Sequence, residues 1–180
     1  MQKNFFLVFK NKLDFIKKLY LTLFFSGLSP KAPGTMGTLV AIPLGFVIEF
    51  YFSTTTLFLS ALLAGAIGIK IIDNYEKEGM EHDRKEIVID ELAGVWITLS
   101  MLGCTLLGGI LSFLLFRLFD IWKPSIIGKV DKQTKGGLGV VGDDLLAGFF
   151  AGLLGLILIG ILQHFEDLGF FSLWETASEN

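Results

Sequence analysis

Residues 92–119, LAGVWITLSMLGCTLLGGILSFLLFRLF, form the longest of four apolar blocks and decide the fold of this chain. The block is long enough to cross a bilayer once with tilt, because about 20 residues cross the ~30 Å hydrocarbon core. Gly103, Gly108 and Gly109 interrupt its middle, so it can instead form the two short helices of a hairpin. The flanking sequence has to decide between one crossing and two.

Basic residues on both sides of this block favour the hairpin. Residues 70–86 and residues 117–135 each contain several lysines and arginines, and such loops prefer the cytoplasmic side of a membrane. Two loops on the same side require an even number of crossings between them. We therefore predict two helices in residues 92–119, each shorter than an ordinary span, that tilt, stop short of the far face or thin the bilayer.

The rest of the chain extends this helical pattern in both directions. The other apolar blocks are residues 39–52, 57–72 and 145–162. Residues 5–25 mix apolar side chains with lysines, which indicates an amphipathic helix on the membrane surface rather than a cleavable signal peptide. The expected fold class is all-α: an integral membrane helical bundle with an N-terminal amphipathic interfacial helix and four to five membrane helices.

We expect one domain over residues 1–180. It comprises an interfacial helix (1–25), a membrane core (26–163) and an acidic tail (164–180), with the N-terminus inside and the tail outside. All 15 lysines and arginines precede Gly136, which supports this orientation.

Composition agrees with a membrane protein and excludes several other classes. Of the 180 residues, 52% are hydrophobic and 18% charged, and the net charge of −3 gives no reason to expect a nucleic-acid partner. The single cysteine, Cys104, rules out an intramolecular disulfide and has no charged residue close by in sequence to activate it. His82 and His164 fall on opposite sides in the expected topology, so a histidine-pair phosphatase site cannot assemble from them.

Acidic residues mark the cytoplasmic boundaries of the expected helices. Asp90 and Glu91 precede the third block, Asp120 follows it, and Asp143 and Asp144 precede the fourth. Carboxylates from different helix ends can converge on a hard cation such as Mg²⁺ and leave positions for water and phosphate. The alternative is that they cap helix N-termini, which explains each pair but neither Asp120 nor the repulsion within the pairs.

Two glycine-rich stretches are candidates for binding phosphate. The first, GTMGT (residues 34–38), ends a turn-rich segment (residues 26–38) that we expect to be irregular, and it offers free N–H groups and hydroxyls close to Lys31. The second, KGGLGVVGDD (residues 135–144), ends at the paired acids and lacks the Walker pattern. A plain loop at the start of a helix explains the first stretch as well, and snorkelling explains Lys123. The candidate substrate-binding residues are Lys31, Gly34, Thr35, Gly37, Thr38, Lys123 and Lys135.

Four segments in the same order resemble the signature motifs of the bacterial phosphatidylglycerophosphatase A family. They are GLSPKAPGTMGT (27–38), IVIDELAG (87–94), RLFDIWKP (117–124) and KGGLGVVGDDLLAG (135–148). Met36 stands where such sequences usually have Trp, and Gly142 where a bulkier residue is common. Both departures suggest altered packing of the loops rather than lost chemistry.

The resemblance implies a Mg²⁺-dependent enzyme of the bacterial cytoplasmic membrane, with its site facing the cytoplasm. It would hydrolyse phosphatidylglycerophosphate, a membrane phospholipid, to phosphatidylglycerol and inorganic phosphate. The motif positions that carry over are Asp90, Glu91, Asp120, Asp143, Asp144, Lys31, Lys123 and Lys135.

Residues and resemblance together lead to one mechanistic hypothesis. Asp90, Glu91, Asp143 and Asp144 hold one or two Mg²⁺, and a lysine neutralises the phosphoryl oxygens. Asp120 is a further ligand or the general base, and a covalent aspartyl-phosphate route stays open. A CDP-alcohol phosphotransferase is disfavoured because its D-G-x-x-A-R signature is missing. A cation transporter is disfavoured because Glu49 is the only acidic residue within an apolar block.

Overall fold

The computed structural model describes residues 12–78, 85–124, 127, 134 and 136–167. Within them it contains six α-helices and one short 3-10 turn, and no strands. The helices are α1 (Lys12–Leu21), α2 (Pro33–Tyr51), α3 (Thr54–Lys77), α4 (Ile89–Leu102), α5 (Leu106–Trp122) and α7 (Gly137–Asp167). The all-α prediction is confirmed.

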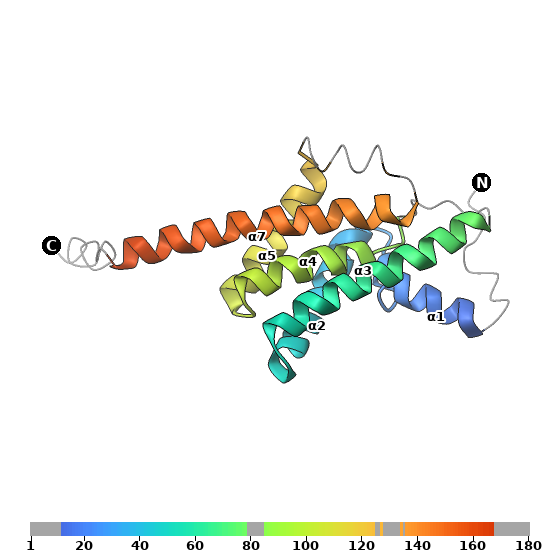
Figure 1. Ribbon diagram of the computed structural model, residues 1–180, viewed down its shortest axis with the longest axis horizontal. Coiled ribbons are helices and arrows are strands. Elements are labelled where there is room, and N and C mark those ends of the chain that lie inside the picture. The colour runs from blue at the N-terminus through green and yellow to red at the C-terminus, as the bar shows by residue number, and fades with distance from the viewer. Residues whose placement is uncertain (1–11, 79–84, 125–126, 128–133, 135, 168–180) are drawn as a thin grey trace.

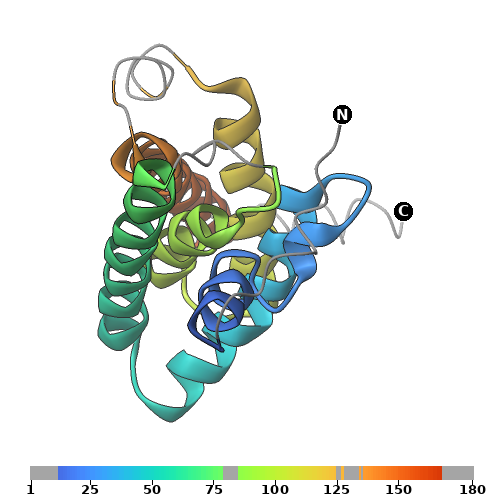
Figure 2. The same ribbon diagram turned by 90° about the vertical axis from the view of Figure 1, so that its right-hand side faces the viewer.

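Helix α4 forms the centre of the bundle, and α2, α3, α5 and α7 pack around it (Figures 1 and 2). Ten of its 14 residues are buried, because it is apolar on every side rather than on one stripe. Trp96 donates a hydrogen bond from Nε1 to the carbonyl of Ala41 at 2.7 Å, which joins α4 to α2. The middle of α4 is therefore held at the core of the molecule.

The longest apolar block forms two helices, as predicted. Helix α4 ends at Leu102 and is followed by Gly103, which has a φ of 81°; α5 begins after Thr105, whose side chain accepts a hydrogen bond from the Gly108 N–H. At 1.5 Å per residue the two helices are about 21 Å and about 26 Å long, less than the ~30 Å hydrocarbon core. Three longer helices, α2, α3 and α7, have the length and apolar composition to cross a membrane. The number of crossings stays a prediction.

Two helices begin earlier than the apolar blocks indicate, and both differences affect the site. The segment expected to be irregular up to Thr38 is helical from Pro33, because proline is well suited to the first position of a helix. Helix α7 starts at Gly137, where the Asp73 carboxylate of α3 accepts the Gly137 N–H at 2.7 Å. Both glycine-rich stretches thus form helical turns over most of their length, not open loops.

The N-terminal segment is helical over Lys12–Leu21, within the predicted amphipathic helix; residues 1–11 lie outside the described part of the chain. Its helix ends before Phe25, where Leu23, Phe24 and Phe25 all have positive φ and the chain reverses. The Tyr20 hydroxyl donates to the Ala64 carbonyl at 2.6 Å, and the Val88 N–H donates to the Leu21 carbonyl. These bonds tie α1 to α3 and to the start of α4, while its place at a membrane surface stays a prediction.

Candidate active site

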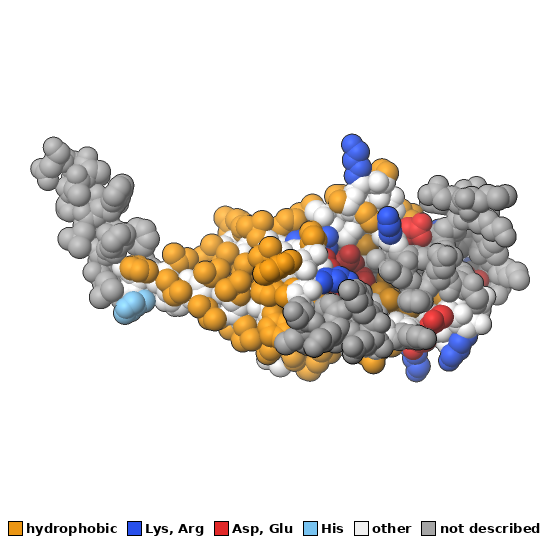
Figure 3. Space-filling model, turned by 90° about the horizontal axis from the view of Figure 1, so that it is seen from above, with side chains coloured by type: hydrophobic (Ala, Val, Ile, Leu, Met, Phe, Trp, Pro, Cys, Tyr) orange, Lys and Arg blue, Asp and Glu red, His pale blue; other side chains and the backbone are white. Residues whose placement is uncertain are grey.

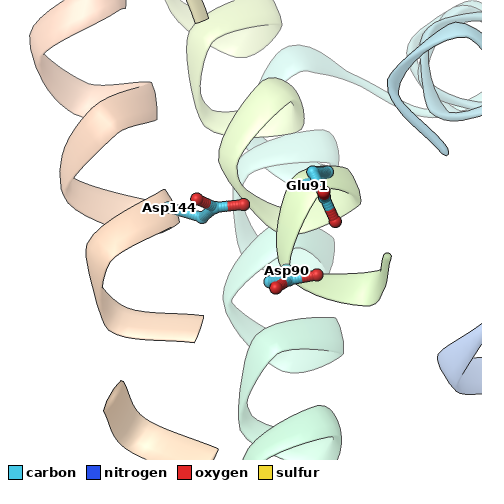
Figure 4. A group of neighbouring side chains, drawn as sticks. All are labelled: Asp90, Glu91 and Asp144. Atoms are coloured by element: carbon cyan, nitrogen blue, oxygen red, sulfur yellow. The ribbon is translucent and has the colours of Figure 1, made fainter. Parts of the chain in front are cut away.

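The acidic residues of α4 and α7 meet because those two helices approach very closely. A Cβ added at Gly148 of α7 would clash with the carbonyl oxygen of Gly94 in α4, and the Thr98 hydroxyl donates to the Gly148 carbonyl at 2.9 Å. This contact lies one helical turn from Asp144 on α7 and from Asp90 on α4. Figure 4 shows the Asp144 side chain pointing from α7 toward the first turn of α4.

Asp90, Glu91 and Asp144 form a group of carboxylates that could hold a metal ion. One oxygen from each lies within 4.8 Å of the others. Asp144 is buried, and the Asp90 Oδ1 and Glu91 Oε2 atoms are shut off from solvent without a hydrogen-bond donor. Buried carboxylate oxygens that lack donors are costly, so this group is suited to a cation.

Burial raises the pKa of the Asp90 carboxyl well above its usual value, and the neighbouring Glu91 and Asp144 charges act in the same direction. Burial also raises the pKa of Glu91, an effect that the Arg117 guanidinium opposes. Both groups stand in the first turn of α4, which is outside the three helices long enough to span a membrane. Without a cation, the site therefore resists full ionisation.

The carboxylates line a cavity of about 460 Å³ at the charged end of the bundle. Its other walls come from the start of α2, the end of α5 and the segments before α4 and α7. The residues that line it are Ala32, Pro33, Gly34, Lys85, Ile87, Asp90, Glu91, Arg117, Asp120, Ile121, Lys123, Thr134, Gly136, Gly139, Val140, Asp143 and Asp144.

Two cations from the end of α5 balance part of this acidic charge. Arg117 Nη1 donates a hydrogen bond to Asp120 Oδ2 and lies 3.8 Å from Glu91 Oε1. Lys123 has a left-handed backbone (φ 43°) just after the helix, and its ammonium lies 2.6 Å from Asp143 Oδ2. Arg117 was not among the site residues predicted from the sequence. Its position inside an apolar block, three residues before Asp120, was the available signal.

The structure brings all five predicted catalytic residues to one cavity, but not all of them into the group suited to a metal. Asp90, Glu91, Asp120, Asp143 and Asp144 all line the cavity, but the group suited to a metal comprises only three of them. Asp143, predicted as a fourth ligand, faces Lys123. Both α7 acids lie beyond the first turn of the helix, so N-terminal capping does not explain them.

The predicted phosphate-binding residues separate into two groups. Gly34 and Lys123 line the cavity, and a Cβ added at Gly34 would clash with Glu91 Oε1. Gly37 packs against Val88, and the Thr38 hydroxyl is buried and donates to the Gly34 carbonyl.

Two further predicted residues, Lys31 and Thr35, do not line the cavity in the structure. Lys31 is exposed, and Thr35 lies in the first turn of α2, next to Gly34. Lys135 lies outside the described residues.

Side chains on the molecular surface divide along the length of the bundle. Figure 3 shows hydrophobic side chains over the half that contains the C-terminal part of α7, whereas acidic and basic side chains gather in the other half. An acidic cavity at the charged end of an apolar helical bundle is typical of a membrane protein with a polar functional site.

Comparisons with known proteins give the family. The model of the family described as phosphatidylglycerophosphatase A matches residues 19–159. Phosphatidylglycerophosphatase A of Escherichia coli is 39% identical over 151 residues, which cover 83% of this chain and 84% of that protein. The chain belongs to the phosphatidylglycerophosphatase A family, and it is a lipid phosphatase.

Two other relatives extend the comparison. Phosphatidylglycerophosphatase A of Haemophilus influenzae is 32% identical over 143 residues, covering 78% of this chain and 88% of that protein. A protein of Bacteroides thetaiotaomicron named "Putative phosphatidylinositol-3-phosphatase" is 38% identical over 148 residues, covering 78% of this chain and 92% of its own length. No solved structure matches the chain.

Proposed function

We propose that this chain hydrolyses phosphatidylglycerophosphate to phosphatidylglycerol and inorganic phosphate. The observation that carries the proposal is the group of Asp90, Glu91 and Asp144, which faces one cavity together with the Arg117 and Lys123 cations. Two relatives with the family name support this substrate. The Bacteroides protein carries a different substrate in its name, so the substrate has to be tested directly.

The donor set fits a divalent hard cation. All three groups offer carboxylate oxygens, and two of those oxygens are buried without a donor. We propose that Asp90, Glu91 and Asp144 hold Mg²⁺, with Asp143 beside them and oriented by Lys123. When bound, Mg²⁺ would neutralise phosphoryl charge and lower the pKa of a coordinated water.

The cationic side chains of the cavity would bind the phosphoryl group. The Arg117 guanidinium and the Lys123 ammonium can donate to its non-bridging oxygens while they keep contact with Asp120 and Asp143. Gly34 leaves room beside Glu91 and Arg117, because any side chain there would occupy this space. Lys31, Thr35 and Lys135 stay in the proposal as outer contacts, whereas Gly37 and Thr38 take a packing role.

The reaction is a single displacement at phosphorus. The oxygen of a water molecule forms a bond to phosphorus as the bond from phosphorus to the glycerol oxygen breaks. The glycerol oxygen keeps the electron pair and takes up a proton, and the attacking water loses a proton. We assign the role of proton acceptor to Asp120, which lines the cavity and is held in place by Arg117.

The proposed orientation places the cavity on the cytoplasmic side of a bacterial inner membrane. Lys31, Lys85, Arg117 and Lys123 all lie at the cavity end of the described chain, in agreement with the preference of basic loops for the cytoplasm. The phosphate can then be reached from water while the acyl chains stay in lipid.

Phosphate release by the purified protein tests this proposal. Phosphatidylglycerophosphate and phosphatidylinositol 3-phosphate are compared in mixed micelles, each with Mg²⁺ and with a chelator. We expect Mg²⁺-dependent release from phosphatidylglycerophosphate and much slower release from the inositol lipid. Faster release from the inositol lipid would overturn the proposed substrate. Equal rates of release with Mg²⁺ and with the chelator would overturn the proposed metal dependence. A flux assay in liposomes checks the transporter alternative, for which we expect no ion movement.

A further inference from the structure

An apolar groove runs between α2 and α5, on the outside of the bundle. Its volume is about 480 Å³. It is lined by Leu39, Ile42, Pro43 and Phe46 of α2 and by Leu106, Gly109, Ile110, Phe113 and Leu114 of α5. Leu39 and Leu114 are about half exposed, so the groove is open on its outer side.

The groove continues the active-site cavity along the same two helices. On α5, Ile110, Leu114, Arg117 and Ile121 follow one another at helical spacing, so they share one face. The first two line the groove and the last two line the cavity. The seam between α2 and α5 therefore has a charged end and an apolar length.

Glycines keep α2 and α5 close at both ends of this seam. At the cavity end, a Cβ on Gly34 would lie 3.0 Å from Arg117 Nη1. In the groove, a Cβ on Gly109 would lie 3.1 Å from Phe46 Cζ. Side chains of the two helices therefore meet at both ends of this seam, with the groove between them.

The dimensions of the groove match one lipid leaflet. From Arg117 back to Leu106 is 11 residues, about 16 Å along a helix axis at 1.5 Å per residue. This is about half of the ~30 Å hydrocarbon core, the depth that the chains of one leaflet occupy. A lipid whose headgroup occupies the cavity beside Arg117 can thus extend its chains along the groove.

We propose that the groove between α2 and α5 binds an acyl chain of the lipid phosphate substrate, in line with the headgroup in the cavity; this rests on the proposed function. An unfilled groove would forfeit dispersion contacts along its whole lining, so a hydrocarbon chain stabilises it. The acyl chain of a bound substrate is already held at the end that joins the headgroup, because the headgroup occupies the cavity. The groove then helps to orient the phosphate ester bond that is hydrolysed toward the carboxylates. It also selects substrates by the length of their acyl chains.

Kinetics with two chain lengths test the inference. Leu114→Trp puts a larger side chain into the groove. Leu107→Trp is the matched control, because Leu107 lies on the same helix, is 50% exposed against 56% for Leu114, and does not line the groove. Activity is measured on dioleoyl and dihexanoyl phosphatidylglycerophosphate in detergent.

We expect Leu114→Trp to raise KM for the dioleoyl lipid about tenfold, which corresponds to about 1.4 kcal/mol. Its kcat/KM for the dihexanoyl lipid should stay within twofold of wild type, and Leu107→Trp should change neither. Equal losses on both lipids, or no loss on either, would overturn the groove as the chain site. A wild-type protein inactive on both lipids would instead contradict the proposed function.

Photolabelling tests the inference in a way that does not depend on catalytic activity. The probe is a phosphatidic acid with a diazirine in its acyl chain, and the labelled peptides are mapped by mass spectrometry. We expect labels within residues 39–46 and 106–114, reduced by Leu114→Trp and unchanged by Leu107→Trp. Labels mainly in residues 16–24 would overturn the proposal in favour of the second apolar groove, next to α1. A change of oligomeric state with Leu114→Trp, measured as the molecular mass of the protein in detergent, would instead indicate that the groove is a contact between two copies of the chain.

Discussion

At the level of single residues, Arg117 is the cation that offsets the negative charge of two acids in the cavity. Its Nη1 donates to Asp120 and lies 3.8 Å from Glu91 Oε1, and both acids belong to the lining. A guanidinium in this position offsets repulsion that two half-buried carboxylates could not otherwise tolerate. The same group faces the space where a phosphate would bind.

Substitution of Arg117 should therefore impair both activity and folding. We expect Arg117→Ala to lower kcat/KM by about 10²–10³-fold, as for removal of a donor to a developing oxyanion, and to lower the Tm. Arg117→Lys should recover part of the stability but little of the activity. In a double-mutant cycle with Asp120→Asn, we expect a coupling energy of about 0.5–3 kcal/mol. Additive effects would show that the two residues act separately.

Asp90→Asn and Asp144→Asn separate metal binding from structure. Asparagine is nearly isosteric with aspartate, so we expect inserted protein that has lost about 10²-fold or more in activity, as when preorganised charge is removed. The matched control is Glu49→Gln, a half-buried carboxylate outside the cavity whose Oε1 accepts from Thr54. Near-normal rates with the same Mg²⁺ dependence in both aspartate variants would make the acids structural.

The pH dependence of stability gives a test that needs no substrate. Because burial raises the folded-state pKa of Asp90 above the unfolded value, metal-free protein should lose stability as pH rises above the ordinary carboxyl range. We expect the Tm in EDTA to fall from pH 5 to pH 8, and Mg²⁺ to restore it at pH 8. Asp90→Asn should weaken both effects in a thermal-shift measurement. A Tm that does not respond to Mg²⁺ at pH 8 would contradict a bound cation.

Gly34 tests the space beside Glu91. Gly34→Ala would force Glu91 and Arg117 apart, so we expect a loss of activity of about tenfold or more with most of the stability retained. Gly160→Ala is the matched control, because Gly160 also lies within a helix and a Cβ there meets no atom within 4 Å. Phosphate release and Tm are measured for both. Equal activity in the two variants would show that the space beside Glu91 is not used.

At the level of elements, the contact between α4 and α7 assembles the carboxylates. Gly94 and Gly148 let the two backbones touch, and Thr98 adds a hydrogen bond across them. Small residues allow such approaches between helices in membranes, where packing rather than the hydrophobic effect holds helices together. The position of Asp144 relative to α4 thus depends on residues that take no part in the chemistry.

Gly148→Val should separate these helices. The added side chain would clash with the Gly94 carbonyl, so we expect a destabilisation of about 1–3 kcal/mol, typical of overpacking. Activity should fall further than stability, because Asp144 moves away from Asp90 and Glu91. Gly160→Val in the same helix serves as the control for a valine in α7. Unchanged activity in Gly148→Val would mean that the carboxylates do not need this contact.

At the level of the whole molecule, charge and apolar surface lie at opposite ends (Figure 3). Cys104 lies in the turn between α4 and α5, and Arg117 and Lys123 follow near the far end of α5. The proposed orientation therefore puts the Cys104 turn toward the outside and the cavity toward the cytoplasm. A thiol-labelling experiment can test it.

Labelling of Cys104 should depend on the side of the membrane to which the reagent is added and on the pH. Burial raises the pKa of this thiol to about 12, with Glu49 acting in the same direction, so the reactive thiolate is scarce at pH 7. An impermeant maleimide on intact cells should react slowly at pH 7, and the rate should rise about tenfold for each unit by which the pH is raised toward that pKa. Lys31→Cys in a Cys104→Ala background should be labelled only in inverted vesicles. Labelling of Lys31→Cys in intact cells would contradict the proposed orientation and place the cavity end on the outside.

The local sequence was enough to predict an all-helical fold and the gathering of acidic residues in one place. Apolar length and the glycines at 103, 108 and 109 predicted two helices in residues 92–119, and the acids at the ends of the blocks predicted one cluster. These features are readable because hydropathy and turn chemistry act between near neighbours in the chain. The class of reaction came instead from the resemblance of four motifs to a known family.

Only the tertiary structure decided which side chains meet. Asp143 faces Lys123 while Asp144 joins Asp90 and Glu91, and Arg117 enters the cavity beside Gly34. The contact that sets this arrangement joins Gly94 to Gly148, far apart in the sequence. Hydropathy cannot distinguish the faces of a helix that is apolar all round, so the direction of each acid depends on the close packing of its neighbours.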